Sequence, residues 1–261
     1  RTFAHWLTEQ RQPPGAVEKF WAVITISALN ETPDRASAAY ALQVFQEGFL
    51  AHREAYVMGV AAVPLVELYD PAETAIEAPG GEVRFGAAVR ALRHDDRRIT
   101  GVQLASGETL TADCYVSAMP FARLDRVIDD DLRQADPRLR SLGEFEVSPI
   151  IGIHLWFDRP VLLRPHLIFV DSPLQWVFNH GIEAGGQHLH GVISAARAWE
   201  DRGSDEIVDM AMRELGGYLP GASDAKLLRG RAIKEKRATF SVRPGLDLIR
   251  PGPTGTIGNL L

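Results

Sequence analysis

The first 58 residues carry apolar side chains at the spacing of amphipathic helices. In TFAHWLTEQ the apolar residues recur three and four positions apart, and GAVEKFWAVITISAL continues the same period. A second helical stretch follows Asn30, where Thr32 and Pro33 are typical of a helix cap and a first helical turn. The pattern therefore predicts helices over residues 1–58. We expect their buried faces to be lined by aromatic residues, namely Trp6, Phe20, Trp21, Phe45 and Phe49.

After this helical region the period changes to that of short strands separated by turns. The segments EVRFG, AVRALRHD, RITGVQLA and ETLTA alternate apolar and polar residues. Hairpin turns are expected at Asp95 with Asp96 and at Ser106 with Gly107, which predicts a three-stranded meander. The apolar run at 114–119 follows, and such a run is typical of a strand covered on both faces in a parallel α/β sheet.

The remaining chain combines charged helices with further strands. A helix is predicted over residues 121–142, and another over 204–220 with Ser204 as its cap. Strands are expected at residues 146–158, 166–171, 174–180, 187–197 and 225–239, with a last strand at 256–261. This order of helices and strands predicts an α/β (α+β) fold.

The composition is that of a globular protein without a general affinity for nucleic acid. Of the 261 residues, 46% are hydrophobic and 24% are charged, as in ordinary folded domains. The formal charge of -6 provides no broad basic surface, so nucleic acid is not expected as a partner. Cys114 is the single cysteine, which rules out an intrachain disulfide and favours a reducing compartment. No apolar run approaches the length needed to cross a bilayer.

The sequence lacks the short motifs that mark several common enzyme classes. G-x-S-x-G, H-E-x-x-H and a Walker loop are absent, which argues against serine hydrolases, zinc proteases and nucleotide triphosphatases. His188 and His190 in QHLHG would share one face of a strand, but no third metal ligand is evident nearby. We therefore expect no metal site, and we interpret His154 and His180 as strand-end or core residues.

The segment from Gly80 to Pro120 carries the most specific pattern in the chain. It begins GGEVRFGAAV, continues through the meander and ends in SGETLTADCYVSAMP. This ordered set resembles the middle of the FAD-binding fold shared by flavin amine oxidases and carotenoid (phytoene-type) desaturases. Residues 20–50 and 234–261 are similar to segments of the hydroxysqualene dehydroxylases, the squalene-associated FAD-dependent desaturases of this superfamily. In essence the resemblance covers the whole chain.

The resemblance implies a partial FAD-binding Rossmann-like domain with a β-meander, together with a mixed-sheet and helical substrate domain. The substrate domain would comprise a helical part at 1–78 and a sheet with helices at 121–235. The FAD domain would comprise 79–120, and 236–261 would return toward it. The family's G-x-G-x-x-G fingerprint and final glycine-aspartate motif are absent from the sequence, so we expect the chain to be an internal fragment of a longer flavoprotein.

The resemblance also implies positions that contact ligands. A strand around Val89 would contact the adenine of FAD through backbone groups, and small residues at the end of a later strand would lie near the dinucleotide. Small side chains are needed there because the cofactor approaches the main chain closely. The predicted cofactor-binding residues are Val89, Ser117, Ala118, Met119 and Pro120. The predicted substrate-binding residues are Asn30, Trp156, Trp176 and Arg237.

Several of these residues also have a purely structural interpretation. Asn30 would either donate a hydrogen bond into a substrate cavity or cap the end of a helix. Trp156 and Trp176 would either line a cavity or fill the core. One of three arginines is expected near the cofactor or the substrate entrance, unless all three form structural ion pairs: Arg237, Arg243 and Arg250. No catalytic residue is identified, and Asp113 is expected to be structural.

The resemblance implies an FAD-dependent oxidoreductase that acts on a long polyisoprenoid. With hydroxysqualene, loss of the allylic hydroxyl would leave a carbocation, and hydride from reduced flavin would convert it to squalene. A carotenoid desaturase, in which hydride moves from the substrate to the flavin, is one alternative. A non-enzymatic prenyl-binding protein resembling the Rab GDP-dissociation inhibitors is another.

Expectations for the cofactor and the partners follow from the same resemblance. We expect FAD in the full-length protein, and weak or absent FAD binding by this chain because the pyrophosphate-binding fingerprint is not in it. The expected partner is an apolar isoprenoid substrate. We expect a cytoplasmic protein with peripheral contact at the inner face of the membrane, and association between copies through uncovered apolar faces.

Overall fold

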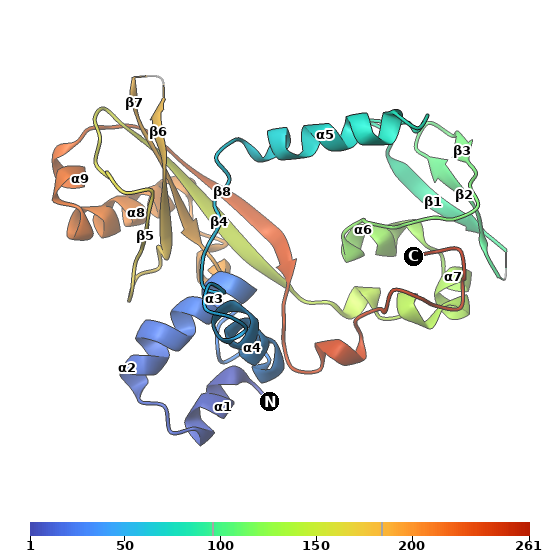
Figure 1. Ribbon diagram of the computed structural model, residues 1–261, viewed down its shortest axis with the longest axis horizontal. Helices are drawn as coiled ribbons and strands as arrows, with labels where there is room; N and C mark the ends of the chain where they lie inside the picture. The colour runs from blue at the N-terminus through green and yellow to red at the C-terminus, as the bar shows by residue number, and fades with distance from the viewer. Residues whose placement is uncertain (96, 184) are drawn as a thin grey trace. The chain divides into compact units, whose positions relative to one another are not determined.

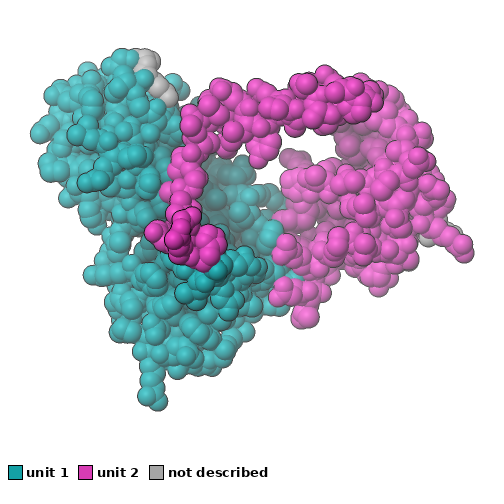
Figure 2. Space-filling view, in the orientation of Figure 1, with its two compact units in different colours: residues 1–51, 146–246 teal, residues 52–145, 247–261 magenta. Residues whose placement is uncertain are grey.

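The computed structural model describes residues 1–95, 97–183 and 185–261. Unit 1 contains residues 1–51 and 146–246, and unit 2 contains residues 52–145 and 247–261, as coloured in Figure 2. The chain changes unit after residues 51, 145 and 246. Assigning the units to a cofactor part and a substrate part remains a prediction.

The N-terminal part of unit 1 is helical up to Leu50, as predicted (Figure 1), whereas residues 51–58 form turns and irregular chain instead of the predicted helix. The helix expected to begin at Thr32 and Pro33 begins at Ala38, with Ser37 as its N-cap. Its elements are α1 (Phe3–Glu9), α2 (Pro14–Ala16), η1 (Val17–Trp21), α3 (Ala22–Leu29), α4 (Ala38–Phe45) and η2 (Gln46–Leu50). Of the predicted core aromatics, Phe45 is buried and Trp6 and Trp21 are partly buried. The prediction is wrong for Phe20 and Phe49, which are 46% and 40% exposed. Both lie in π-helical turns, whose wider spacing rotates side chains away from the face expected for a regular α-helix.

The rest of unit 1 is built around a five-stranded sheet. The strands are β4 (Val147–Phe157), β5 (His166–Ile168), β6 (Trp176–Glu183), β7 (Gly186–Ile193) and β8 (Leu227–Phe240). Their order is β5-β6-β7-β4-β8. All pairs between these strands are antiparallel, so the sheet is antiparallel rather than mixed, and the α+β class is confirmed.

One face of this sheet is covered by helix α8 (Ser204–Tyr218), and η5 (Ala196–Trp199) and α9 (Pro220–Asp224) complete the unit. Alternate residues of β4, including Ile153 and Phe157, pack with Ile207 and Leu215 in the main core. The N-cap of α8 is Gly203, not Ser204 as predicted, because the Ser204 hydroxyl accepts a hydrogen bond from the backbone of β8. Buried and partly buried residues alternate along β4, so every second side chain of this strand lies on the sheet face opposite α8.

Unit 2 contains the predicted meander. Its three strands are β1 (Val89–His94), β2 (Ile99–Leu104) and β3 (Thr109–Leu110), paired in that order. In the first hairpin turn the Asp95 carboxylate accepts hydrogen bonds from the backbone of Arg97 and Arg98, both at 2.9 Å, while Asp96 lies outside the described residues. The second predicted turn is confirmed by Gly107, whose φ of +94 suits glycine.

Three predicted strands of unit 2 are wrong. Residues 82–86 form no strand, since the chain turns at Gly86 and leaves Phe85 82% exposed. At 114–119 and 256–261 the structure has a single parallel bridge, between Tyr115 and Leu260, instead of two strands. Val116 is 75% exposed, so the run is not covered on both faces as expected.

The single helix predicted at 121–142 is divided into short pieces. These are α6 (Phe121–Val127), α7 (Asp130–Ala135), η3 (Pro137–Leu139) and η4 (Leu142–Glu144). Asp129 interrupts the helix because its side chain caps α7 by accepting from Leu132 N at 2.9 Å. Asp136 and Pro137 cause the next break, where Asp136 caps the following 3-10 turn.

The C-terminal segment of unit 2 is held by a buried arginine clamp. Arg138 donates to the carbonyls of Pro253 at 3.0 Å and Leu260 at 2.8 Å, and it pairs with the fully buried Asp136 at 2.7 Å. A Cβ at Gly255 would lie 2.0 Å from the Arg138 Nε, so only glycine fits there. The clamp therefore places the chain around Leu260 beside Tyr115, at the position of the predicted cofactor strand.

The chain has two further helical elements, α5 and η6. Helix α5 (Leu65–Glu77) in unit 2 buries none of its residues, and the apolar pattern had assigned no element to residues 59–78. The 3-10 turn η6 (Leu246–Leu248) spans the last change of unit. None of the helices in the described parts of the chain is both long enough and apolar enough to span a bilayer.

Candidate functional site

The first candidate region is a cavity of unit 2, which we call the arginine-lined cavity. It has a volume of about 560 Å³ and is lined by Ala87, Ala88, Val89, Arg90, Met119, Pro120, Arg123, Arg126 and Val127. The structure thus brings together three of the five predicted cofactor-binding residues, Val89, Met119 and Pro120. Its arginine side chains favour a ligand that carries negative charge.

The arginine-lined cavity lies at an edge of the meander. Val89 begins β1, which is an edge strand of the three-stranded sheet, so the outer backbone groups of β1 are not used in the sheet. Ala87 and Ala88 precede it, and their small side chains leave the main chain accessible. Sequence reasoning missed Arg123 and Arg126, which enter the lining because α6 begins directly after Pro120.

The other two predicted cofactor residues lie next to this region. Ala118 is exposed, whereas Ser117 is partly buried and lines a smaller cavity of about 160 Å³ with Leu124, Arg138 and Leu261. The Ser117 backbone donates to Leu261 O at 2.8 Å. Its side-chain hydroxyl is buried without a hydrogen-bond partner among the described residues, which marks it as an atom that a polar ligand could satisfy.

The second candidate region is the face of the unit 1 sheet opposite α8, which we call the aromatic face. Its residues are His154, Trp156, Trp176, Phe178, His180, His188 and His190. The register of the strands brings these side chains together, because His154 is the cross-strand partner of His190, Trp156 of His188, and Phe178 of His190. Both predicted substrate-binding tryptophans therefore lie on this face.

Stacking and hydrogen-bond contacts with neighbouring side chains hold both tryptophans of the aromatic face in place. The Trp156 ring stacks on His188 with centroids 4.5 Å apart and planes 5° apart, and the Arg229 guanidinium lies 4.9 Å from its centroid. The Trp176 ring stacks on Phe178 at 5.5 Å, and its Nε1 donates to the hydroxyl of Ser27 on α3 at 2.7 Å. Each ring is thereby oriented rather than loosely packed.

Four of these residues form a histidine cluster: His154, His180, His188 and His190. The ring centroids of His154 and His190 are 4.4 Å apart, and those of His180 and His188 are 4.9 Å apart. His154 Nδ1 and His188 Nε2 form a hydrogen bond of 3.0 Å. Gly152 leaves room for this packing, since a Cβ there would lie 2.8 Å from His190 Nε2.

The environment keeps at least one of these imidazoles uncharged at neutral pH. Burial, and then the charges of His154, His180 and His188, lower the pKa of His190 to about 4. The interpretation of His154 and His180 as strand-end or core residues is wrong, because β4 and β6 direct both rings to the aromatic face. Across the described part of the chain, no group of three metal-ligating side chains is placed to hold an ion.

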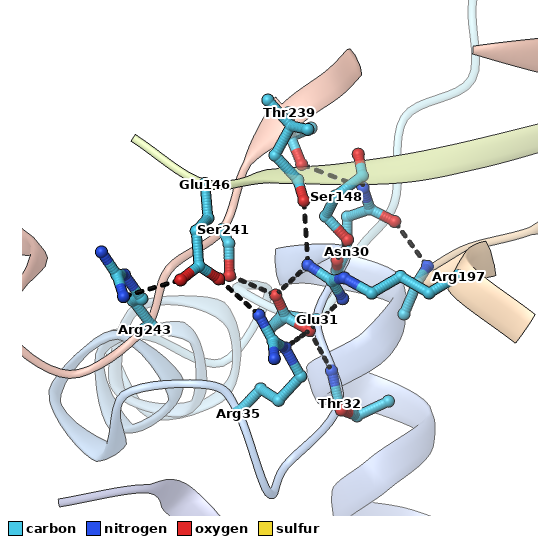
Figure 3. A network of polar contacts seen from close by, with 12 residues as sticks. Asn30, Glu31, Thr32, Arg35, Glu146, Ser148, Arg197, Thr239, Ser241 and Arg243 are labelled. Carbon is cyan, nitrogen blue, oxygen red and sulfur yellow. Dashed lines mark hydrogen bonds and ion pairs between the residues drawn. The ribbon is translucent and has the colours of Figure 1, made fainter. Parts of the chain in front are cut away.

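Asn30 lies in a different environment from the two tryptophans. It is the C-cap of α3 in the left-handed conformation, with a φ of 51, so the capping interpretation is confirmed. Its amide donates to Ser148 O at 3.0 Å and Thr239 Oγ1 at 2.9 Å, and accepts from Ala195 N at 2.6 Å (Figure 3). The amide nitrogen and oxygen of Asn30 are thus both engaged within unit 1.

The next residue, Glu31, is the centre of a buried ion-pair network (Figure 3). Its side chain is fully buried and accepts from Arg197 Nη1 at 2.7 Å and Nη2 at 2.8 Å. Ser241 and the Thr32 backbone also donate to it. Burial alone would raise the pKa of Glu31, but Arg197 and Ser241 together hold it below its usual value. The network ties the α3–α4 connection to the sheet and so has a structural role.

The remaining polar candidates are not among the residues that form the aromatic face or line the arginine-lined cavity. Arg237 is exposed on β8, in the stretch where the register with β4 shifts opposite Pro149. Arg243 pairs with Glu146 at 2.7 Å, in agreement with a structural ion pair, and Arg250 is exposed. Asp113 is exposed, and its carbonyl accepts from Asn259. A substrate role for Arg237 remains a prediction.

Comparison with known proteins shows which family the chain matches. A family model described as flavin containing amine oxidoreductase matches residues 2–260. The chain is 26% identical to a 15-cis-phytoene desaturase of Synechococcus elongatus, covering 99% of this chain and 58% of that protein. It is 27% identical to a hydroxysqualene dehydroxylase of Sinorhizobium fredii, covering 91% and 54%. The chain spans about half the length of the curated relatives it matches.

Solved structures share the fold at lower identity. An oxidoreductase from Methanosarcina mazei matches with a TM-score of 0.79 and 17% identity, covering 99% of this chain and 61% of that one. Cyclohexylamine oxidase from Brevibacterium oxydans matches with a TM-score of 0.67 and 15% identity, covering 99% and 57%. These likenesses confirm the fold class.

Proposed function

Because the chain belongs to the flavin containing amine oxidoreductase family, we propose that it forms part of an FAD-dependent oxidoreductase. In this proposal the arginine-lined cavity of unit 2 receives the adenine end of FAD. The outer backbone groups of β1 at Val89 can hydrogen bond to a flat heterocycle, and Arg123 and Arg126 can compensate negative charge. The unpartnered hydroxyl of Ser117 offers a further polar contact.

The residues present therefore fit the cofactor. When bound, FAD supplies hydride in its reduced form or accepts hydride in its oxidised form. The chain's own residues would bind and orient it: Val89, Met119 and Pro120 by backbone and apolar contact, and Ser117 by its hydroxyl. Binding by this chain alone is expected to be weak, since the residues supply contacts to one part of the dinucleotide.

The aromatic face of unit 1 supports an apolar substrate. Trp156, Trp176 and Phe178 supply apolar ring surface, and His190 is uncharged at neutral pH, so a hydrocarbon chain can contact that imidazole without burying a charge on it. We propose a long polyisoprenoid as the substrate. The single observation that carries this choice is the row of ordered aromatic rings on one sheet face.

The reaction that we propose is the reductive dehydroxylation of hydroxysqualene to squalene. An allylic cation formed by loss of the hydroxyl would be stabilised by an aromatic ring of this face, such as Trp176. Aromatic rings can do this while excluding water, which would otherwise recapture the cation. The similarity to a hydroxysqualene dehydroxylase at 27% identity supports this reaction.

A second candidate is the desaturation of a carotenoid precursor, in which hydride leaves the substrate. The similarity to a phytoene desaturase over 99% of the chain favours it. The two candidates are separated by incubating the natural full-length protein with FAD and either hydroxysqualene plus a reductant or phytoene plus an electron acceptor. Squalene in the first reaction supports dehydroxylation. Unchanged hydroxysqualene together with desaturated phytoene would reject it, and an unbound flavin with no turnover would favour the prenyl-binding alternative.

A further inference from the structure

The histidine cluster contains a hydrogen-bonded pair that the binding of an apolar chain does not require. An apolar wall needs no ring nitrogens, yet four imidazoles from three adjacent strands meet on this face. Two of them, His154 and His188, are joined nitrogen to nitrogen at 3.0 Å, so one ring donates a proton to the other. Such a pair can hold one additional proton in a charge-assisted hydrogen bond, which is stronger than a neutral one.

The surroundings of the pair favour proton transfer over metal binding. The rings lie nearly parallel, with 25° between His154 and His188 and 26° between His180 and His188, so their nitrogens do not converge on one point. His180, which stacks on His188, is exposed and His154 is partly exposed, so the pair lies close to solvent. His190 does not compete for the proton, because burial and the neighbouring imidazoles lower its pKa to about 4.

The charged groups that face the pair come from the strands beside it. On β8, Arg231 is the cross-strand partner of His154, and Arg229 lies against Trp156, the ring stacked on His188. Glu235 is opposite Ile150, which precedes His154 by four residues on β4. The nearest cross-strand charge is therefore positive, which favours release of a proton from the pair to a substrate.

We propose that the His154–His188 pair is the proton donor for departure of the substrate hydroxyl, an inference that rests on the proposed dehydroxylation. The carbon–oxygen bond breaks with its electron pair going to oxygen, and the proton from the imidazolium joins the hydroxyl so that water leaves. Reduced flavin, when bound, would supply the hydride that converts the resulting allylic cation to the hydrocarbon. The neutral pair regains a proton from solvent, so the net reaction consumes one hydride and one proton.

The test compares His154→Gln and His188→Gln with His5→Gln in the natural full-length protein. Glutamine retains hydrogen-bonding groups but cannot carry the proton, and His5 is an exposed residue of α1 outside the aromatic face. With hydroxysqualene, reduced flavin and product analysis, we expect each cluster variant to lose about 100-fold in kcat with KM changed less than about twofold, and the control to match wild type. The wild-type kcat should fall as pH rises, and this dependence should be lost in both variants.

A second readout does not depend on turnover. In NMR titrations with ¹⁵N-labelled histidine, His154 and His188 should titrate as a coupled pair, and His188→Gln should shift the midpoint of His154. Wild-type kcat and pH dependence in both variants, or independent titration of the two rings, would overturn the proton-donor role while leaving the dehydroxylase function intact. A wild-type protein that forms no squalene would instead reject the proposed function and the donor role with it.

Discussion

The buried ion pair of Glu31 gives the sharpest test of how unit 1 is held together. We consider the substitution Glu31→Gln, which keeps the shape of the side chain and removes its charge. In the wild type both guanidinium nitrogens of Arg197 donate to the fully buried carboxylate, at 2.7 and 2.8 Å. The variant leaves Arg197 without its counter-charge.

The magnitude follows from the burial of the two partners. Removing one partner of a buried ion pair costs about 3–5 kcal/mol, because the other charge is left uncompensated. Arg197 keeps 31% of its side chain exposed, and partial hydration reduces this loss. We therefore expect the free energy of unfolding of unit 1 to fall by about 2–4 kcal/mol.

Urea denaturation followed by tryptophan fluorescence measures this loss selectively. All five tryptophans lie in unit 1, so their emission reports that unit and not unit 2. Glu146→Gln is a matched control, since Glu146 also pairs with arginines in Figure 3 but is 43% exposed. The control should lose less than about 1 kcal/mol. Equal losses in the two variants would refute the reasoning.

The same pair predicts a pH dependence with a defined sign. The folded state holds the pKa of Glu31 below its unfolded value, because Arg197 and Ser241 outweigh burial. The carboxylate therefore contributes stability above the unfolded pKa and loses it as pH falls through the folded pKa. The difference in unfolding free energy between wild type and Glu31→Gln should shrink in acid. A difference that grows on acidification would contradict the assignment.

Three further predictions concern the other parts of the structure. Asp136→Asn should weaken the Arg138 clamp, and hydrogen exchange at residues 257–261 should become faster than in wild type; unchanged protection would argue against the clamp. Burial lowers the pKa of His94, but the hydrogen bond and charge of Asp129 outweigh burial, so the pKa is raised in the folded state. The pair should therefore stabilise unit 2 at low pH and lose that contribution as pH rises through the folded pKa of His94. A difference in melting temperature between wild type and His94→Gln that stays constant from acid to neutral pH would contradict this. Leu155→Ala in the core of unit 1 should cost about 2–5 kcal/mol in urea unfolding monitored by tryptophan emission, and a loss under 1 kcal/mol would indicate that Leu155 is not packed as described.

Local patterns predicted most of the regular elements because the signals for them lie within a few residues. The strand expected at residues 146–158 is β4, and the spacing of His188 and His190 predicted that they share a strand face. The breaks at Asp129 and Pro137 also had local signals, a capping aspartate and an Asp-Pro step, which the helical pattern around them obscured.

The parts that could not be predicted depend on pairing between distant segments. His154 joins the cluster only because the register of β4 with β7 places it opposite His190, and that register is set by the packing of the whole sheet. Asn30 meets Ser148 and Thr239 across more than one hundred residues of sequence. The run at 114–119 looked fully buried by composition, but only Tyr115 turns toward the core of unit 2.

Reaction with hydroxysqualene distinguishes the proposed dehydroxylation from every alternative function. The decisive measurement is the product formed when the natural full-length protein, reconstituted with FAD and supplied with a reductant, is incubated with hydroxysqualene and extracted for mass spectrometry. We predict squalene, formed in proportion to the bound flavin and absent when the reductant is omitted. Recovery of unchanged hydroxysqualene from a preparation with stoichiometric, reducible flavin would contradict the proposed function.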